Sequence, residues 1–276
     1  MLPSSDVREL VDDALWSAHR DTAAEVLRDD ERARSAMTGV ADPEWNGVLR
    51  AVPDPDGDVD DLVHELLAPY VTTATPMLWH LGDDADPRLE PALLRAGLVL
   101  VEREPTMVAD LELPLVPVPD APVEIHPVTD LVGLRAWACV LLGVDPRADA
   151  VVPGPALPLL GALVAARAGV ALPGGGRHAP HLVATSDGLP VGCVATFVSG
   201  PAAVVDHVVT ARPWRGHGIG TALTCAALAA GRDAGHRRAV LTASPDGREL
   251  YRRLGFTEVG EVRRYRWTPG TRAPVG

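Results

Sequence analysis

The stretch Val204–Gly220, VVDHVVTARPWRGHGIG, decides the fold. A run of β-branched residues predicts a strand, and the strand leads into a loop with three alternating glycines. A helix pattern begins at once, because apolar residues recur at helical spacing from Ile219 to Ala230 and Gly235 is placed to end the helix. Free N–H groups at a helix start attract anions, and glycines let a ligand approach the backbone closely. The stretch therefore predicts a site for a phosphate group.

Three kinds of glycine-rich loop bind phosphates, and the flanking residues distinguish them. A Walker loop needs a lysine followed by Ser or Thr, but Gly220 is followed by Thr and Ala, and the chain has no lysine. A dinucleotide-binding loop needs Gly-x-Gly-x-x-Gly and an acidic residue after the next strand. Here the loop is Gly-x-Gly-x-Gly, and the next strand, Ala239–Ala243, is followed by Ser244 instead of an acidic residue. Arg-x-x-Gly-x-Gly after a strand matches Arg215–Gly220 and resembles the acetyl-CoA pyrophosphate loop of the GNAT acyltransferase family. A plain strand-to-helix turn is the alternative.

A second motif follows the loop in the order that this family shows. Tyr251-x-x-x-Gly255-Phe256 resembles the family's closing motif, in which the tyrosine often lies near the CoA sulfur and protonates the leaving thiolate. The resemblance covers about residues 123–268. It implies an α/β fold with a mixed sheet, the acyl-CoA N-acyltransferase (GNAT) fold.

The resemblance also implies where acetyl-CoA binds. The loop amides would hold the pyrophosphate, and the strand before the loop would splay from its neighbour, so that its backbone binds the pantetheine arm and polarises the thioester carbonyl. No metal is implied. The cofactor-binding residues that follow are Val208, Val209, Thr210, Arg215, Gly216, His217, Gly218, Ile219, Gly220 and Thr221.

Tyr251 is the predicted general acid, with a packing role as the alternative. Helical spacing places Leu250 and Leu254 on the core face, so we expect Tyr251 to be angled away from the core. The family often uses an acidic residue of the central strands, or an ordered water, as the general base. The candidates here are Asp206 and His207, and because side chains alternate along a strand, we expect one of the two to face the site.

Charge and cysteine content exclude several classes of protein. The net charge of −12 argues against general nucleic-acid binding. Residues 211–276 hold 12 arginines and 5 acidic residues, against 13 and 32 in the remainder. A basic cofactor domain beside an acidic remainder suits an anionic cofactor such as CoA together with a cationic amine substrate, although ordinary surface solubility fits the same numbers. Cys139, Cys193 and Cys225 lack metal or disulfide spacing. With no targeting pattern and no membrane-spanning tract, we expect a soluble, cytoplasmic protein.

The first half of the chain contains a degenerate copy of the closing motif in Asp86–Leu98. When Gly97 is aligned with Gly255, a proline falls on a proline and Leu93 falls on Tyr251. Strands are expected before and after both copies. We therefore predict two tandem copies of the fold, of which the first has lost the tyrosine and the glycine loop and should lack a cofactor. The domains are 1–113, degenerate and GNAT-like; 114–122, a Pro-rich linker; and 123–276, the catalytic domain.

Several further elements are expected. Residues 5–37 are predicted to be helical, and the helix that follows Asp61 is expected to end at Pro69. In the second half, helices over 129–142 and 156–168 precede a hairpin around Asp187-Gly188, with strands over 181–185 and 190–198. Phe256 opens a strand, and a further strand is expected over 263–267. His178 and His181 are expected near the approach of the substrate.

These observations predict an N-acetyltransferase that uses acetyl-CoA and a primary amine of a small molecule or protein. Direct attack of the amine in a ternary complex is favoured, because no Cys or Ser nucleophile signature is present. A longer acyl-CoA donor is one alternative, and a non-catalytic acyl-CoA-binding sensor is another. The sequence leaves the oligomeric state open, with a homodimer among the options.

Overall fold

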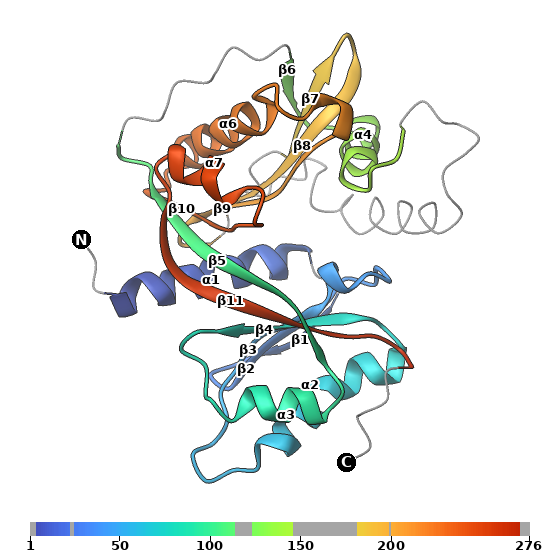
Figure 1. Cartoon of the computed structure of the whole chain (residues 1–276), viewed down its shortest axis with the longest axis vertical. Coiled ribbons are helices and arrows are strands. Elements are labelled where there is room, and N and C mark those ends of the chain that lie inside the picture. Colours follow the sequence, from blue (N-terminus) through green and yellow to red (C-terminus); the bar gives the residue numbers. More distant parts are fainter. Residues whose placement is uncertain (1–3, 23–24, 114–122, 146–180, 199, 271–276) are drawn as a thin grey trace. The chain divides into compact units, whose positions relative to one another are not determined.

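A computed structural model describes residues 4–22, 25–113, 123–145, 181–198 and 200–270 (Figure 1). The chain forms two compact units, each made of two stretches of sequence. Unit 1 comprises residues 1–21 and 106–259, and unit 2 comprises residues 22–105 and 260–276. The units therefore differ from the predicted domains 1–113 and 123–276, each of which is one continuous stretch of sequence. The predicted linker 114–122 and the predicted helix 156–168 lie outside the described residues.

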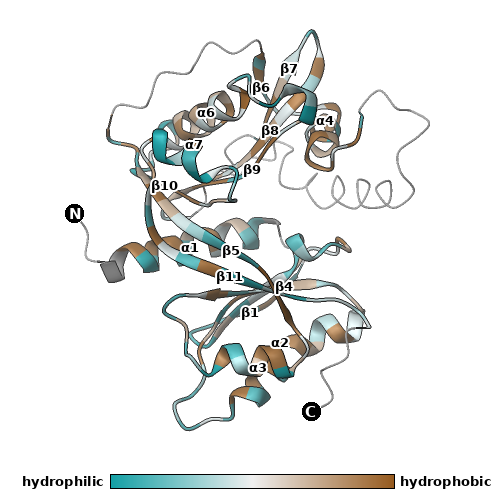
Figure 2. Ribbon diagram, viewed as in Figure 1, coloured by the Kyte–Doolittle hydropathy of each residue, from teal (hydrophilic) through white to brown (hydrophobic). Residues whose placement is uncertain are grey.

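Unit 2 is built on a mixed sheet with the strand order β1-β2-β3-β4-β11-β5. The β1-β2, β2-β3 and β4-β11 pairs are antiparallel, and the β3-β4 pair is parallel. Figure 2 shows α2 and α3 on one side of this sheet. Buried residues of these helices and of the strands form the hydrophobic core of the unit. The elements are β1 (Glu25–Asp29), β2 (Ala33–Met37), η1 (Pro43–Trp45), β3 (Gly47–Ala51), α2 (Val59–Thr73), β4 (Met77–Gly82), α3 (Leu89–Arg95), β5 (Val99–Asp110) and β11 (Thr257–Trp267).

Unit 1 has the strand order β5-β10-β9-β8-β7-β6. The β9-β10 pair is parallel and the other pairs are antiparallel. Figure 1 shows α6 and α4 on opposite sides of β8, and α6 and α7 contribute to one hydrophobic core. The elements are α1 (Ser4–Thr22), β6 (Glu124–Pro127), α4 (Leu131–Leu141), β7 (Leu182–Ser186), β8 (Leu189–Phe197), β9 (Ala203–Thr210), η2 (Arg212–Trp214), α6 (Ile219–Asp233), β10 (Arg238–Thr242) and α7 (Arg248–Arg253).

The two units repeat one another element by element. β1-β2-β3-α2-β4-α3 in unit 2 corresponds to β7-β8-β9-α6-β10-α7 in unit 1, with the same strand order and the same parallel pair. The helix ends match in detail. Leu98 N–H donates to the Leu93 carbonyl at 3.0 Å, and Phe256 N–H donates to the Tyr251 carbonyl at 3.0 Å. Gly97 and Gly255, with φ of 85° and 89°, take the left-handed conformation that ends a helix. The local geometry thus supports the predicted duplication.

The last strand of each half of the sequence enters the sheet of the other unit. β5 follows α3 in the chain, but its residues Thr106–Asp110 pair with β10. In the same way, residues Val262–Trp267 of β11 pair with β4. β11 also attaches to α3, because Tyr265 and Arg263 both bind Glu90 and hold the pKa of that carboxyl below its usual range. This exchange explains why each unit needs two separate stretches of chain.

The exchange also changes the distribution of charge. Unit 1 contains 14 arginines and 18 acidic residues, and unit 2 contains 11 arginines and 19 acidic residues. The basic stretch 211–276 is therefore divided between two acidic units. Arg263 and Arg264, at its end, pair with carboxylates of unit 2. The excess of arginine in this stretch does not form one basic domain.

Three sequence predictions about individual elements were wrong. The N-terminal helix ends at Thr22, and residues 25–37 form a hairpin whose second strand buries Ala33, Ala36 and Met37. α2 continues through Pro69 to Thr73. Proline has no N–H to donate to the Glu65 carbonyl, but Glu65 is exposed and water can bind this carbonyl. The next residue, Tyr70, is fully buried, which favours the continued helix. The strand after Phe256 is continuous, because the single strand β11 spans both predicted segments.

The predicted hairpin around Asp187-Gly188 is confirmed, with φ of 48° and 75° at these residues. The helix over 129–142 is also confirmed, and the Asp130 side chain caps it by accepting from Gly133 N–H at 2.7 Å. Among the helices that the structure describes, none is long and apolar enough to cross a bilayer.

A chain that ends at Val259 should lose the folded state of unit 2. It lacks the residues that pair with β4, and the core of unit 2 loses the buried Tyr265 and Trp267. Removing a buried aromatic side chain costs about 3–5 kcal/mol, which is a large part of the stability of a domain. Thermal unfolding and limited proteolysis of residues 22–105 measure the effect, with a chain ending at Gly270 as control. Equal melting temperatures for the two chains would contradict the role of the exchanged strand.

Candidate functional site

The glycine loop leaves the start of α6 without a side-chain cap. Gly218 is the N-cap residue with φ of 78°, and as a glycine it has no side chain that could cap the first turn. Ala222 N–H donates to the Gly218 carbonyl at 2.9 Å, so the amides that precede Ala222 in the first turn lack this helical hydrogen bond. Gly216 also has positive φ, at 82°, and a Cβ there would meet no atom within 4 Å. This arrangement can bind an anion through main-chain N–H groups.

Two glycines hold α6 close to the sheet. A Cβ on Gly192 of β8 would lie 2.8 Å from Leu223 and 2.9 Å from Ile219, which are in the first two turns of α6. A Cβ on Gly231 of α6 would lie 2.7 Å from the Cβ of Ala203 in β9. At either position a side chain would force the neighbouring residues to shift. α6 is thus fixed against β8 and β9 at both of its ends, and its first turn lies next to the end of β9.

β9 and β10 separate after a short region of pairing, as the resemblance implied. The ladder between them contains two pairs, Ala203 with Ala239 and Val204 with Val240. β9 continues to Thr210 in pairing with β8 on its other edge. The main chain of Val208–Thr210 therefore has an edge that does not pair with β10. Such an edge can hydrogen-bond an extended ligand.

Side chains and main chain fix the loop to the end of β9. Arg215 Nε donates to the Thr210 carbonyl at 3.3 Å. His217 Nδ1 lies 3.0 Å from the Arg215 carbonyl, and since a carbonyl can only accept, this nitrogen carries the proton. In the part of the chain that the structure describes, Arg212 and Arg215 form no ion pair, and both are exposed. Their charges are available to an anion.

A β-bulge brings the two candidate bases together. Cys193 is paired with Val209 and Ala195 with Asp206, so that His207 and Val208 both lie opposite Val194. His207 has φ of 51°, a strained value for a residue other than glycine. Side-chain alternation fails at this point. Asp206 accepts from His207 N–H at 2.7 Å, and its other carboxylate oxygen lies 3.4 Å from His207 Nε2. The two side chains therefore contact one another instead of pointing to opposite faces of the strand, and which of them faces the site stays a prediction.

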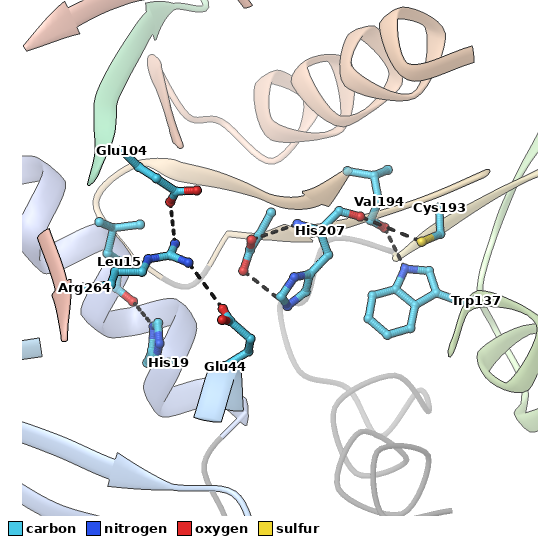
Figure 3. Close-up of polar contacts among 10 residues, drawn as sticks. Leu15, His19, Glu44, Glu104, Trp137, Cys193, Val194, His207 and Arg264 are labelled. Carbon is cyan, nitrogen blue, oxygen red and sulfur yellow. Dashed lines mark hydrogen bonds and ion pairs between the residues drawn. The ribbon is translucent and has the colours of Figure 1, made fainter. Parts of the chain in front are cut away.

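The surroundings of His207 are aromatic (Figure 3). The Trp137 ring meets the His207 ring edge-on at 6.1 Å, and it stacks on His181 at 4.9 Å. His181 is buried, with 4% of its surface exposed, and it packs against Trp137 and Phe197 in unit 1. His178 lies outside the described residues. Sequence analysis missed Trp137, because an apolar helix position gives no signal of its partner.

Tyr251 is buried and does not point away from the core. It is 8% exposed and packs edge-on against Phe256, with ring centroids 5.8 Å apart. Leu250, which was expected on the core face, is only partly buried. A Cβ on Gly247 would lie 2.7 Å from the Tyr251 ring, so this glycine is needed for the position of the ring. Burial is compatible both with packing and with a protected proton donor.

The counterpart of this site in unit 2 carries the opposite charge. β3 and β4 also pair at only two positions. The loop between β3 and α2, however, contains Asp54, Asp56 and Asp58, and the Asp58 side chain caps α2 by accepting from Asp60 N–H at 2.8 Å. Leu93, which is fully buried, stands where unit 1 has Tyr251. These residues disfavour an anionic ligand at the start of α2. Among the described residues, no group of three or more His, Cys, Asp or Glu side chains is placed to hold a metal ion.

Comparison with known families decides the nature of this domain. Residues 177–258 match the family model described as "Acetyltransferase (GNAT) domain". The chain contains a GNAT acetyltransferase domain. The match begins before β7 and ends in β11, so it includes the splayed strand, the glycine loop and Tyr251. A GNAT domain marks an acyl-CoA-dependent acetyltransferase. No curated protein matches the chain.

Solved structures share the fold over nearly the whole chain. A GCN5-related N-acetyltransferase from Kribbella flavida is 20% identical with a TM-score of 0.66, covering 94% of this chain and 95% of its own. A protein of unknown function from Staphylococcus epidermidis is 16% identical with a TM-score of 0.61, covering 89% and 94%. A tandem GNAT protein from the clavulanic acid biosynthesis pathway is 17% identical with a TM-score of 0.55, covering 89% and 82%. The fold is therefore the GNAT fold, and an arrangement of two copies occurs in a solved structure.

The strain at His207 can be measured directly. His207→Gly should be more stable than His207→Ala by about 1 kcal/mol, because both variants lose the imidazole but only glycine accepts positive φ without strain. Urea unfolding of the two variants gives the difference. Equal stability, or a more stable alanine variant, would show that residue 207 does not hold the left-handed conformation in the folded protein.

Proposed function

We propose that this protein transfers the acetyl group of acetyl-CoA to a primary amine of a small molecule or protein, by direct attack in a ternary complex. The observation that carries the proposal is the continuous run of main-chain groups from the free edge of β9 to the uncapped start of α6. A pantetheine arm fits the extended edge, and a diphosphate fits the helix start. The ten residues predicted to bind the cofactor all belong to this run, Val208–Thr210 and Arg215–Thr221.

Asp206 and His207 are proposed to act together as the general base. An imidazole can accept a proton from an ammonium group near neutral pH, and a carboxylate 3.4 Å from its Nε2 stabilises the imidazolium that forms. The amine then attacks the thioester carbonyl, a C–N bond forms and the C–S bond breaks. Main-chain N–H groups beside the bulge are the proposed donors to the carbonyl oxygen during this step.

Tyr251 is the proposed acid that protonates the departing thiolate. The motif around it carries this role, and its place on α7, close to β10 in the chain, agrees with a position beside the opening between β9 and β10. Its ring is buried, so solvent has little access to it. The side-chain hydroxyl is therefore the group to test.

A pair of glycine variants tests the diphosphate site. Gly216→Ala and Gly235→Ala both place a Cβ at positive φ, 82° and 92°, where no atom lies within 4 Å. Each should lower stability by about 1 kcal/mol. Only Gly216→Ala should weaken CoA binding in calorimetry, by about tenfold or more, because Gly235 lies at the far end of α6. If both variants bind CoA like the natural protein, the loop is not the diphosphate site.

Tyr251→Phe separates an enzyme from a sensor. We expect thiol release from acetyl-CoA in the presence of an amine panel to fall about 100-fold or more, while CoA binding stays within a factor of two. Tyr70→Phe is the matched control, since Tyr70 is buried in unit 2 and donates to the Ala36 and Gly47 carbonyls. CoA binding without turnover by the natural protein on any amine would favour the non-catalytic acyl-CoA-binding module. The chain has no lysine, so acetylation of its own lysine side chains cannot confound this assay.

A further inference from the structure

The bulge beside Asp206 is held by side chains from three different elements. His207 has φ of 51°, a conformation that costs on the order of 1–3 kcal/mol and persists only where the surroundings enforce it. The contacts that enforce it come from Asp206 of β9, Cys193 of β8 and Trp137 of α4. They reach the main chain on both sides of the bulge, as Figure 3 shows for Trp137, Cys193 and Val194.

Each contact is made to a backbone group of the bulge. Trp137 Nε1–H donates to the carbonyl of Val194, the residue that lies opposite the bulge, at 3.0 Å. The Cys193 thiol donates to the His207 carbonyl at 3.7 Å. Asp206 accepts from His207 N–H at 2.7 Å. The amide and carbonyl of the strained residue are thus both bound by side chains.

We propose that Trp137 and Cys193 are positioning residues that set the His207 imidazole and the main chain after it for the transfer reaction. Neither touches the reacting atoms. The inference rests on the proposed function, in which His207 takes the proton of the amine. Trp137 acts through its ring, which meets the imidazole edge-on at 6.1 Å, and through its hydrogen bond to Val194. Cys193 acts through the His207 carbonyl.

The burial of both residues suits this role. Trp137 is fully buried and stacks on His181 at 4.9 Å, so its indole has little freedom to turn. Burial raises the pKa of the Cys193 thiol, so the sulfur keeps its proton and remains a donor. A thiol in this state is not a nucleophile, which agrees with direct attack by the amine.

The first experiment compares two tryptophan variants in the full-length protein. Trp137→Phe keeps an aromatic ring but removes the indole N–H. Trp79→Phe is the matched control, because Trp79 is also fully buried and its Nε1 has no hydrogen-bond partner among the described residues. We expect kcat to fall about 10- to 100-fold in Trp137→Phe with KM for acetyl-CoA unchanged, and to stay unchanged in Trp79→Phe.

The second experiment keeps the inference testable if Trp137→Phe fails to fold. Cys193→Ala removes the donor to the His207 carbonyl with little loss of volume, whereas Cys193→Ser keeps a donor at this place. We expect kcat to fall several-fold in Cys193→Ala and to recover at least in part in Cys193→Ser. An equal loss in both, or no loss in either, would contradict the positioning role of Cys193.

An imidazole readout separates this inference from the proposed function. In spectra of protein with ¹⁵N-labelled histidine, the His207 signal is identified by its absence in His207→Ala. We expect this signal to shift or broaden in Trp137→Phe and in Cys193→Ala, and to stay unchanged in Trp79→Phe. If it shifts but the natural protein acetylates no amine, the proposed function fails while the positioning role stands. If it is unchanged in both folded variants, the positioning role is overturned.

Discussion

The close packing of α6 against β8 and β9 is the constraint on which the rest of the site depends. It requires Gly192 and Gly231, since a Cβ at either position would lie less than 3 Å from a neighbouring side-chain atom. With the helix held in this way, its first turn lies next to the end of β9, and the glycine loop connects the two. The main-chain amides of the loop then follow the free edge of β9 in the chain, which is the arrangement that the proposed binding of an extended, anionic ligand requires.

The repetition of the fold shows what is needed for architecture and what is needed for chemistry. Both units keep the parallel pair that ends after two residues, the helix that follows it and the glycine that ends the next helix. Unit 2 replaces the glycine loop by aspartates, and Leu93 replaces Tyr251. The shared features set the architecture, and the features that differ are the loop and the residue for which roles in ligand binding and catalysis are proposed. Each unit also contains a strand from the other half of the sequence, because β5 pairs with β10 and β11 pairs with β4.

Periodicity and glycine spacing predicted much of unit 1. The strand, loop and helix around Arg215–Gly220, the hairpin at Asp187-Gly188 and the capped helix α4 all follow from local chemistry, because turns and caps are set by residues close in sequence. The failures have a common cause. Residues 25–37 and Pro69 were assigned from local pattern, yet burial in the core of unit 2 determines both. The bulge that joins Asp206 to His207 escaped prediction because alternation assumes a regular ladder.

The sequence by itself determined the class of the domain and the strand, glycine loop and helix that carry the proposed anion site, because glycines and a helix start act through the backbone of adjacent residues. Only the tertiary structure decided which strands share a sheet, where Tyr251 points and which side chains hold His207. Those outcomes depend on partners that are far away in the chain, such as Trp137 for the Val194 carbonyl and Thr106–Asp110 for β10. The physical reason is that such contacts form only when distant segments are buried together, and no local pattern encodes the identity of the partner.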